Sequence, residues 1–459
     1  MSESYHFVGI GGAGMSALAR ILAAKGERVT GSDMAESSTL SALRAEFGID
    51  ASAGHSAANI NGATRVIVSA AIKEDNPEVV AAKKAGLGTL SRSQMLGELM
   101  GLYHTSIAVA GTHGKTTTSA MIAQMLEYAD CDPTALIGGD VPAWHSNARL
   151  GHTDVFVAEA CEAYGSFLDM RSFISVVTNI EADHLDYYAD LDDIMDAFRR
   201  FLSRSARKYL CVDDPNCRKL ASEFEGVTTY GFSDTAMARG IPDPGHPGKF
   251  SVLYRGSEQG EITLSVPGRH NMLNALAAVA VGLEVPIPEA LKDGLPFSEI
   301  AKGLAKFSGT GRRFEKVGET AKDVLVIDDY AHHPTELRAT LAAAREAYPD
   351  RRLIAVFQPH LPSRTRDFMP DFARSFGDAD LVVLTDIYLA REKALEGVSG
   401  ALLAEKVAEA RGEERVRFVE DKADLPAALA EIAQPGDVVL TLGAGDIDKA
   451  GRKFLEISR

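Results

Sequence analysis

Cysteine is scarce in this sequence: 459 residues contain four, and these lack the spacing of metal ligands, at Cys131, Cys161, Cys211 and Cys217. A long chain with so few cysteines has no disulfide framework, which favours a reducing, intracellular compartment. The sequence also lacks a basic and apolar leader at its N-terminus, and it has no run of about 18 apolar residues that would span a bilayer. These absences predict a cytoplasmic protein without a membrane segment.

Positive charge is also in deficit. The chain has 48 Lys and Arg residues against 64 Asp and Glu residues, which gives a net charge of −16. This balance argues against a nucleic-acid partner, because such proteins present a basic surface, but it leaves room for local pockets that bind small anions. The apolar fraction of 46% is sufficient for several cores. At about 150 residues per domain, the length predicts roughly three domains.

What the sequence does contain is a repeated alternation of apolar strands and helical segments. The expected strands cover residues 6–10, 27–33, 65–72, 107–110, 154–160, 174–184, 353–360, 381–386 and 437–445, with another starting at 324. A hairpin is expected at 250–268, and helices at 15–26 and 271–285. The alternation predicts an α/β fold of three domains, each a mostly parallel sheet with flanking helices. We place the domains at residues 1–105, 106–315 and 316–459.

The first glycine motif is GIGGAG at residues 9–14, between a predicted strand and a predicted helix, with Asp33 about 20 residues further on. Such a turn accommodates a pyrophosphate at the helix N-terminus and a ribose beside the acidic residue. NAD satisfies these conditions, and so does a UDP-sugar. The alternative is a tight strand–helix turn without a ligand.

The second glycine motif is GTHGKTTT at residues 111–118. A glycine turn at a helix start binds phosphate through free backbone N–H groups and the helix dipole. Lys115 would reach the outer phosphates of a nucleotide, and Thr116 would hold Mg²⁺ through its hydroxyl. The motif departs from the standard phosphate loop, because Val109 stands where the first glycine is expected. An ordinary N-terminal cap is the alternative, but a cap does not require the lysine.

Polar residues follow the next two predicted strands. Glu159 ends one strand, and Asn179, Asp183 and His184 end the other. Open α/β sheets bind ligands at this edge, so Glu159 is a candidate Mg²⁺ ligand. His184 is a candidate for a second metal shell or for orienting a phosphate, with a helix cap as its alternative.

The last third of the chain adds amide, imidazole and guanidinium groups. Asn271 and Asn274 either contact a purine edge or cap a helix. The arginines of GRRF at 311–314 either neutralise a phosphoryl group or belong to a solvated linker. Two further clusters suit an anionic substrate better than a metal, namely Asp328, Asp329, Tyr330, His332, His333 and Glu336, and His360, Arg364 and Arg366.

Taken together, the motifs resemble those of the Mur ligases in order and spacing over essentially the whole chain. They are HFVGIGGAGMSALA, AGTHGKTTT, TNIEADHLDYY, PGRHNMLNA, SGTGRRFE, DDYAHHPTE, FQPHLPSRTRD and LGAGDI. The resemblance implies a UDP-substrate domain, an ATP domain and a C-terminal domain that closes over the active site. It implies ATP-dependent addition of L-alanine to the carboxylate of UDP-N-acetylmuramate, a cytoplasmic step of peptidoglycan precursor synthesis, with ATP and Mg²⁺ as cofactors.

The same resemblance implies roles for individual residues. The implied catalytic residues are Lys115, His184, Arg313 and His332. The implied ATP contacts are Gly111, Thr112, His113, Gly114, Lys115, Thr116, Thr117, Asn271, Arg313 and Asp329. The implied UDP-substrate contacts are Gly11, Gly12, Ala13, Gly14, Met15, Ser32, Asp33 and Ser69. The implied metal positions are Thr116, Glu159 and His184, and the implied C-terminal amino-acid site is His332, His360 and Arg364.

The sequence departs from its relatives at three points. EACEAYGSF replaces a motif that has aspartate at Cys161, and Leu361 stands where some relatives have arginine. Later members of the family use a carbamylated lysine, whose position falls near Phe198 in this chain. This chain therefore cannot use that lysine, which fits the alanine-adding member of the family. Three alternatives stay open: a ligase that attaches a whole murein tripeptide, an NAD-dependent oxidoreductase built on GIGGAG, and a nucleotide sensor without enzymatic activity.

Overall fold

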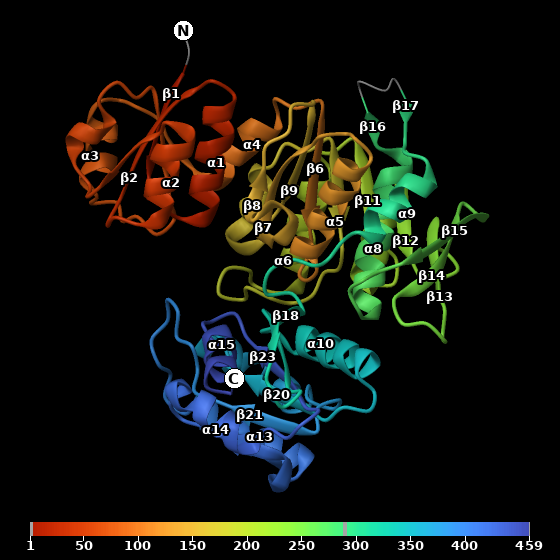
Figure 1. Cartoon of the computed structure of the whole chain (residues 1–459). Coiled ribbons are helices and arrows are strands. Elements are labelled where there is room, and N and C mark those ends of the chain that lie inside the picture. Colours follow the sequence, from red (N-terminus) through yellow and green to blue (C-terminus); the bar gives the residue numbers. More distant parts are fainter. Residues whose placement is uncertain (1–2, 288–291, 459) are drawn as a thin grey trace. The chain divides into compact units, whose positions relative to one another are not determined.

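The computed structural model describes residues 3–287 and 292–458, and its strands form three main sheets with flanking helices (Figure 1). By packing, the chain forms two compact units. The first runs to Gly240 and includes residues 252–260 and 273–304, and the second holds residues 241–251, 261–272 and the chain from Ala305 onward. The α/β class with mostly parallel sheets confirms the prediction from the sequence.

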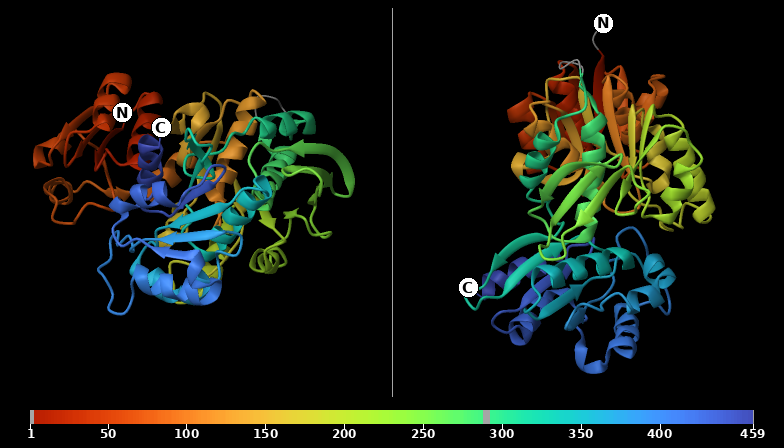
Figure 2. Two further views of the ribbon diagram at one scale, coloured as in Figure 1. Left: turned by 60° about the horizontal axis from the view of Figure 1, so that its bottom comes forward. Right: turned by 90° about the vertical axis from the view of Figure 1, so that its right-hand side faces the viewer.

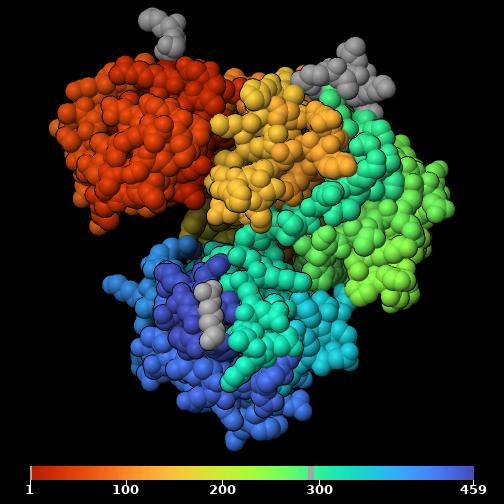
Figure 3. Space-filling view, in the orientation of Figure 1, coloured from red at the N-terminus to blue at the C-terminus, as the bar shows by residue number. Residues whose placement is uncertain are grey.

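The N-terminal sheet has five parallel strands in the order β3-β2-β1-β4-β5. The strands are β1 (Ser4–Val8), β2 (Arg28–Asp33), β3 (Asp50–Ala53), β4 (Arg65–Val68) and β5 (Thr89–Ser91). The helices are α1 (Ala13–Ala24), α2 (Ser38–Phe47), η1 (Ala57–Ile60), α3 (Pro77–Lys84) and α4 (Arg92–Met100). The atoms of this part, in red, pack as one continuous body (Figure 3). The sequence analysis misses β3 and β5, because DASA and TLS contain too few apolar residues for a visible alternation.

The central sheet has ten strands in the order β15-β14-β13-β12-β11-β10-β6-β9-β7-β8. The strands are β6 (Thr105–Ala110), β7 (Thr134–Val141), β8 (Ser146–Arg149), β9 (Val155–Glu159), β10 (Ile174–Val177), β11 (Arg207–Cys211), β12 (Val227–Gly231), β13 (Ala238–Pro242), β14 (Lys249–Tyr254) and β15 (Ser257–Thr263). The helices are α5 (Lys115–Tyr128), η2 (Pro142–Trp144), η3 (Ala163–Asp169), α6 (Leu191–Leu202), α7 (Pro215–Ala221), α8 (Arg269–Glu284) and α9 (Phe297–Ala305). Every residue of β6 is buried, as expected for a parallel strand that is covered on both faces.

Strand β10 ends much earlier than the sequence pattern predicts. The apolar run suggests a strand over 174–184, but the strand stops at Val177. Thr178 and Asn179 leave the ladder because their side chains bond to the backbone of His113. The predicted strand was therefore too long, and Thr178 and Asn179 hold the neighbouring loop that contains His113 instead.

The C-terminal sheet has six strands in the order β18-β19-β23-β20-β21-β22, all parallel except β18. This part of the chain has the teal to blue colours in Figure 2. The strands are β18 (Glu315–Glu319), β19 (Leu325–Asp329), β20 (Leu353–Phe357), β21 (Leu381–Leu384), β22 (Val416–Phe418) and β23 (Val438–Leu442). The helices are α10 (Pro334–Ala347), α11 (Pro362–Asp367), α12 (Met369–Ala373), α13 (Gly400–Arg411), η5 (Glu413–Arg415), η6 (Lys422–Asp424), α14 (Leu425–Ile432) and α15 (Asp448–Ile457). A small ribbon of β16 (Pro286–Ile287) and β17 (Lys292–Asp293) stands apart from the three sheets.

One carboxylate in the N-terminal sheet is completely buried, that of Glu78 on α3. Its Oε2 accepts hydrogen bonds from Ser32 Oγ at 2.6 Å and His6 Nε2 at 3.3 Å. Its Oε1 accepts from the Ser56 backbone N–H at 3.0 Å and Asn59 Nδ2 at 2.6 Å. Burial by itself raises the pKa of this carboxyl, but the four donors outweigh burial and lower the pKa to about 2.

Glu78→Gln should therefore lower the free energy of unfolding at pH 7 by about 2–3 kcal/mol. The NH₂ group of the glutamine replaces one carboxylate oxygen, so the groups that donate to that oxygen lose their acceptor. The pKa of Glu78 is lower in the folded chain than in the unfolded chain, so its ionised form stabilises the fold above pH 4.5 and less as the pH falls toward 2. The difference between wild type and variant should shrink by about 1 kcal/mol between pH 7 and pH 4. Urea unfolding at both pH values measures this difference, with the half-exposed Glu98→Gln as control. A difference that does not change with pH would contradict this account.

Candidate active site

The turn between β6 and α5 is shaped by two glycines that no other residue can replace without strain. Gly111 and Gly114 have φ angles of +134° and +81°. A Cβ atom on Gly111 would lie 2.0 Å from Thr178 Oγ1, and one on Gly114 would lie 2.7 Å from Asn274 Oδ1. Within the described part of the chain, no side chain caps the first turn of α5 at Gly114, which argues against the ordinary-cap alternative. A helix start without a side-chain cap leaves backbone N–H groups available for an anion.

Asn179 holds this turn in place. The His113 backbone N–H donates to Asn179 Oδ1 at 2.8 Å, and Asn179 Nδ2 donates to the His113 carbonyl at 3.0 Å. The Thr112 backbone N–H donates to the Asn179 carbonyl at 3.0 Å. The polar residues at the end of β10 thus fix the loop after β6, the neighbouring strand.

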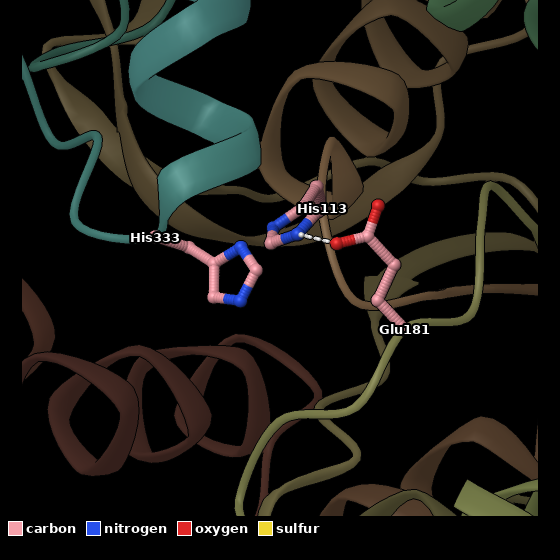
Figure 4. A group of neighbouring side chains, drawn as sticks. All are labelled: His113, Glu181 and His333. Atoms are coloured by element: carbon pink, nitrogen blue, oxygen red, sulfur yellow. Dashed lines mark hydrogen bonds and ion pairs between the residues drawn. The ribbon is translucent and has the colours of Figure 1, made fainter. Parts of the chain in front are cut away.

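A second brace uses the side chains of His113 and Glu181, which face one another in Figure 4. His113 Nε2 lies 3.4 Å from Glu181 Oε2. The Glu181 backbone N–H donates to Thr112 Oγ1 at 2.8 Å. Sequence reasoning gave Glu181 no role, although it lies in the same TNIEADH segment as the predicted residues.

Lys115 is buried at the start of α5, and its ammonium group is surrounded by acceptors. Nζ donates to the carbonyls of Gly111 at 2.6 Å and Thr112 at 3.0 Å, and it lies 2.8 Å from Glu162 Oε2. Burial alone lowers the pKa of Lys115, but the carboxylates of Glu162 and Glu159 reverse this and raise it above its ordinary value. The lysine therefore carries a full positive charge in the loop.

Glu162 is a second residue of this site that sequence reasoning missed. It is buried, pairs with Lys115, and lies 3.5 Å from His184 Nε2. Burial raises the pKa of Glu162, but Lys115 and His184 outweigh it and lower the pKa below its ordinary value. Its position three residues after Glu159, beyond the end of a buried strand, was the available signal.

The predicted metal residues are only partly brought together. Thr116 Oγ1 donates to Glu159 Oε2 at 2.7 Å, and the Gly138 backbone N–H donates to the same oxygen at 3.0 Å. A hydroxyl and a carboxylate side by side at a sheet edge are donors that Mg²⁺ accepts, so these two residues fit the ion. His184 instead contacts Glu162 and Asp183, and its backbone has a φ of +54°. Thr117, the next residue of the loop, is buried in α5.

The two asparagines of α8 have different neighbours. Asn274 Oδ1 accepts from Thr118 Oγ1 at 3.1 Å, so it packs against the phosphate-loop helix. Asn271 Nδ2 donates to the Pro267 carbonyl at 2.7 Å, which places it at the start of α8. Both interpretations of these residues, cap and purine contact, are therefore compatible with their positions.

The N-terminal glycine turn lies at the carboxyl ends of β1, β2 and β4. Asp33 Oδ2 accepts from the Gly11 backbone N–H at 2.8 Å, and Asp33 Oδ1 accepts from Met34 N–H at 2.7 Å. A Cβ atom on Gly11 would lie 2.8 Å from Asp33 Oδ2. The structure places the predicted UDP-contacting residues along this edge, namely Gly11, Gly12, Ala13, Gly14, Met15, Ser32, Asp33 and Ser69. The carboxylate of Asp33 therefore shapes the glycine turn.

The predicted residues of the C-terminal sheet form a cluster of their own. His332 Nδ1 lies 3.2 Å from Glu336, and its ring centroid lies 5.9 Å from that of His360. Arg364 approaches His360 Nδ1 at 3.4 Å. The structure thus brings together the three residues predicted to form the amino-acid site.

Arg313 lies next to this cluster, with its guanidinium 3.8 Å from Glu336 and 5.1 Å from the Tyr330 ring. Asp329 accepts from the backbone N–H groups of Phe314 and Ala331, both at 2.8 Å. Burial raises the pKa of Asp329 to about 6, and Arg313 and the two donors oppose this only in part.

Arg312, which the sequence analysis did not distinguish from Arg313 until the family resemblance was applied, anchors the linker to the C-terminal sheet. Its Nε donates to the buried Asp328 at 2.9 Å, and its other nitrogens donate to the carbonyls of Gly443 and Gly445, both at 2.8 Å. Of the two arginines in GRRF, Arg312 is therefore structural. Arg313 keeps a partly exposed guanidinium, 29% accessible, at the cluster.

Phe198, near which the resemblance places the carbamylated lysine of other members, is fully buried and packs edge-on against Phe167. No lysine is available at this place in the site. The four cysteines are unbonded, as expected for a chain without a disulfide framework. Among the described residues, no helix is long and apolar enough to cross a membrane.

The fold and the two glycine turns define a class of protein, and comparison with known families identifies it. Residues 4–104 match "Mur ligase family, catalytic domain", residues 109–282 match "Mur ligase middle domain", and residues 312–445 match "Mur ligase, glutamate ligase domain". The chain belongs to the Mur ligase family, which confirms the resemblance seen in the sequence.

Three relatives are similar over nearly their whole length. The UDP-N-acetylmuramate–L-alanine ligase of Geobacter sulfurreducens is 45% identical, covering 99% of this chain and 97% of the relative. The enzyme of the same name from Salinibacter ruber is 46% identical, covering 98% and 94%. The crystal structure of the UDP-N-acetylmuramate-alanine ligase MurC from Thermotoga maritima superposes with a TM-score of 0.80 at 30% identity, covering 99% and 98%.

Proposed function

We propose that this chain joins L-alanine to the carboxylate of UDP-N-acetylmuramate at the expense of ATP, in the cytoplasmic synthesis of the peptidoglycan precursor. The observation that carries this proposal is the similarity to L-alanine ligases over 99% of the chain, which includes the turn that buries Lys115. This similarity favours a UDP-sugar over NAD as the ligand of the GIGGAG turn. The second phosphate turn, which an oxidoreductase leaves unexplained, binds ATP.

Each domain takes one part of this reaction. Residues 1–105 bind the UDP substrate, through the residues along the glycine turn and the end of β2. Residues 106–315 bind ATP, and residues 316–459 close over the site and supply the groups that meet the amino acid. Closure of domains excludes water from a reactive intermediate, which an acyl phosphate needs because water hydrolyses it.

The chemistry follows from the poor reactivity of a carboxylate toward an amine. A carboxylate oxygen attacks the γ-phosphorus of ATP, and the bond to the bridging oxygen breaks, which yields an acyl phosphate and ADP. The amine of alanine then attacks the acyl carbon, and inorganic phosphate leaves as the amide forms and the amine loses its proton. No covalent bond to the protein is required, so catalysis consists of positioning and charge neutralisation.

The chain's own groups serve these two steps. Gly111, Thr112, His113, Gly114, Thr116 and Thr117 present the turn to the phosphates, and Lys115 neutralises the outer ones. Thr116 and Glu159 would hold Mg²⁺, which supplies charge neutralisation between the phosphates when bound. Glu162 orients Lys115 and His184, so that His184 meets the γ-phosphoryl group or a second ion.

The C-terminal groups complete the proposal. Arg313 neutralises the phosphoryl group in transit, and Asn271 and Asp329 contact the nucleoside end of ATP. His332, His360 and Arg364 orient the amino acid by its carboxylate. His332 is held by Glu336, which keeps its ring oriented.

Phosphate release with ATP, Mg²⁺ and UDP-N-acetylmuramate, with each amino acid in turn, tests the proposed function. We expect release that depends on the UDP substrate and is at least tenfold faster with L-alanine than with L-glutamate or D-alanine. Incorporation of radiolabelled alanine should match the phosphate released.

Three other results would contradict the proposal. Release with the murein tripeptide but not with alanine would identify the tripeptide ligase. A change of nicotinamide absorbance without ATP would identify an oxidoreductase. ATP binding without phosphate release in the presence of all substrates would identify a sensor.

A further inference from the structure

The hydrogen bonds around Glu78 fix where the protons of its neighbours lie. An ionised carboxylate only accepts hydrogen bonds, so the single proton of the Ser32 hydroxyl points to Glu78 at 2.6 Å. Ser32 Oγ then has only lone pairs left to offer. His55 Nδ1, at 2.9 Å from this oxygen, must donate to it.

The two histidines of this network are thereby set in opposite tautomers. His55 carries its proton on Nδ1, and its Nε2 is left without one when the ring is neutral. His6 donates from Nε2 to Glu78 at 3.3 Å, and its Nδ1 lies 2.8 Å from Thr30 Oγ1. His6 is buried, whereas the side chain of His55 is 16% exposed. Of the two histidines, His55 is therefore the one whose unprotonated Nε2 can face solvent or a ligand.

The network lies under the edge of the sheet where the UDP substrate is proposed to bind. Ser32 is the residue before Asp33 at the end of β2, and its carbonyl accepts from the backbone N–H groups of Gly9 at 2.8 Å and Ile10 at 2.9 Å. Through Ser56 and Asn59, the same carboxylate also holds the segment 54–59 that follows β3. One buried group thus joins α3, the glycine turn and the segment after β3.

We propose that Glu78 is a positioning residue for the UDP substrate, which acts through the Ser32 hydroxyl to fix the tautomer and orientation of His55 and the segment 54–59. This inference rests on the proposed function. Glu78 itself is completely buried and touches no substrate. Glutamine has nearly the same shape as glutamate. Its NH₂ group, however, would face two of the four groups that donate hydrogen bonds to the Glu78 carboxylate. The arrangement of the edge is then lost while the fold around it stays similar.

Steady-state kinetics of Glu78→Gln separate a positioning role from a merely structural one. We expect the KM for UDP-N-acetylmuramate to rise at least tenfold, while kcat and the KM for ATP stay within twofold. A merely structural role lowers the amount of active enzyme, and therefore kcat, without changing either KM. The matched control is Glu98→Gln, which removes a partly exposed carboxylate on α4 that pairs with Arg65, and it should leave all three values within twofold.

A double-mutant comparison tests whether Glu78 acts through Ser32. Ser32→Ala removes the hydroxyl that relays the carboxylate to His55. The KM for UDP-N-acetylmuramate should then be similar, within about twofold, in Ser32→Ala and in Ser32→Ala combined with Glu78→Gln. If instead the increase in KM of the double variant equals the product of the increases in the two single variants, Glu78 does not act through Ser32.

A spectroscopic measurement on the wild-type full chain decides the case even where Glu78→Gln fails to fold. Long-range ¹H–¹⁵N spectra of protein labelled with ¹⁵N-histidine report the tautomer of each ring, and His55→Gln assigns the signal of His55. We expect His55 with its proton on Nδ1 in the wild type, since this atom lies 2.9 Å from Ser32 Oγ and 3.6 Å from Glu78 Oε2, and neither oxygen has a proton left to offer it. A wild-type His55 protonated on Nε2 would overturn the proposal.

The outcome also separates this inference from the function on which it rests. A wild-type protein that releases no phosphate with alanine and UDP-N-acetylmuramate refutes the proposed function. An active wild type with an unchanged KM in Glu78→Gln refutes the positioning role alone.

Discussion

Lys115→Ala should reduce kcat on the order of 10³-fold, because it removes the only cation that the structure places inside the phosphate turn among the described residues. Phosphate release with all substrates present measures this loss. The variant also removes the lysine that neutralises the buried Glu162 carboxylate and leaves it only His184, which costs about 3–5 kcal/mol of stability. A loss of activity in this variant therefore has two sources that must be separated.

The double variant Lys115→Ala/Glu162→Gln separates them. Glutamine removes the buried charge, so the free energy of unfolding should recover most of its wild-type value while activity stays low. Lys302→Ala, on the exposed side of α9, is the matched control and should remain fully active. Activity within tenfold of wild type in the folded double variant would show that the turn does not use its lysine on phosphate.

Glu159→Ala should raise the Mg²⁺ concentration for half-maximal activity at least tenfold and lower kcat by about 10²-fold, because a hydroxyl alone is a poor anchor for the ion. Glu159 is the carboxylate that touches Thr116 at the start of α5. The measurement is a Mg²⁺ titration of phosphate release at saturating ATP.

Glu299→Ala is the control, because Glu299 pairs with Lys302 on the surface of α9. Its Mg²⁺ dependence should match that of the wild type. An unchanged dependence in Glu159→Ala as well would mean that Glu159 serves only as an acceptor for Thr116 and Gly138.

The sequence predicted the fold class and part of the active site because those features depend on local patterns. The contact between Thr116 and Glu159 was predictable, since both residues end or follow buried parallel strands and such ends meet at one edge. The same rule placed Asn179 beside the phosphate turn. The sequence pattern overestimated the length of β10. The strand ends before Thr178 and Asn179, whose side chains donate hydrogen bonds to the His113 carbonyl in the loop after β6.

The features that sequence reasoning missed depend on pairs distant in the chain. Glu162 and Lys115 are 47 residues apart, and the local signal, a position just beyond a buried strand, does not reveal that the two side chains pair. His6, Ser32 and Glu78 are separated by up to 72 residues, and each alone is an unremarkable polar residue. Arg312 and Arg313 are adjacent, and only the carbonyls of Gly443 and Gly445 show which one anchors the linker.

A crystal structure of the full chain with Mg²⁺ and a non-hydrolysable ATP analogue tests the central claim most directly. The account predicts the triphosphate over the turn from Gly111 to Thr117, with Lys115 Nζ on its outer phosphates and the ion between Thr116 and Glu159. A nucleotide bound elsewhere, with this turn empty and Lys115 still held by Glu162, would contradict it.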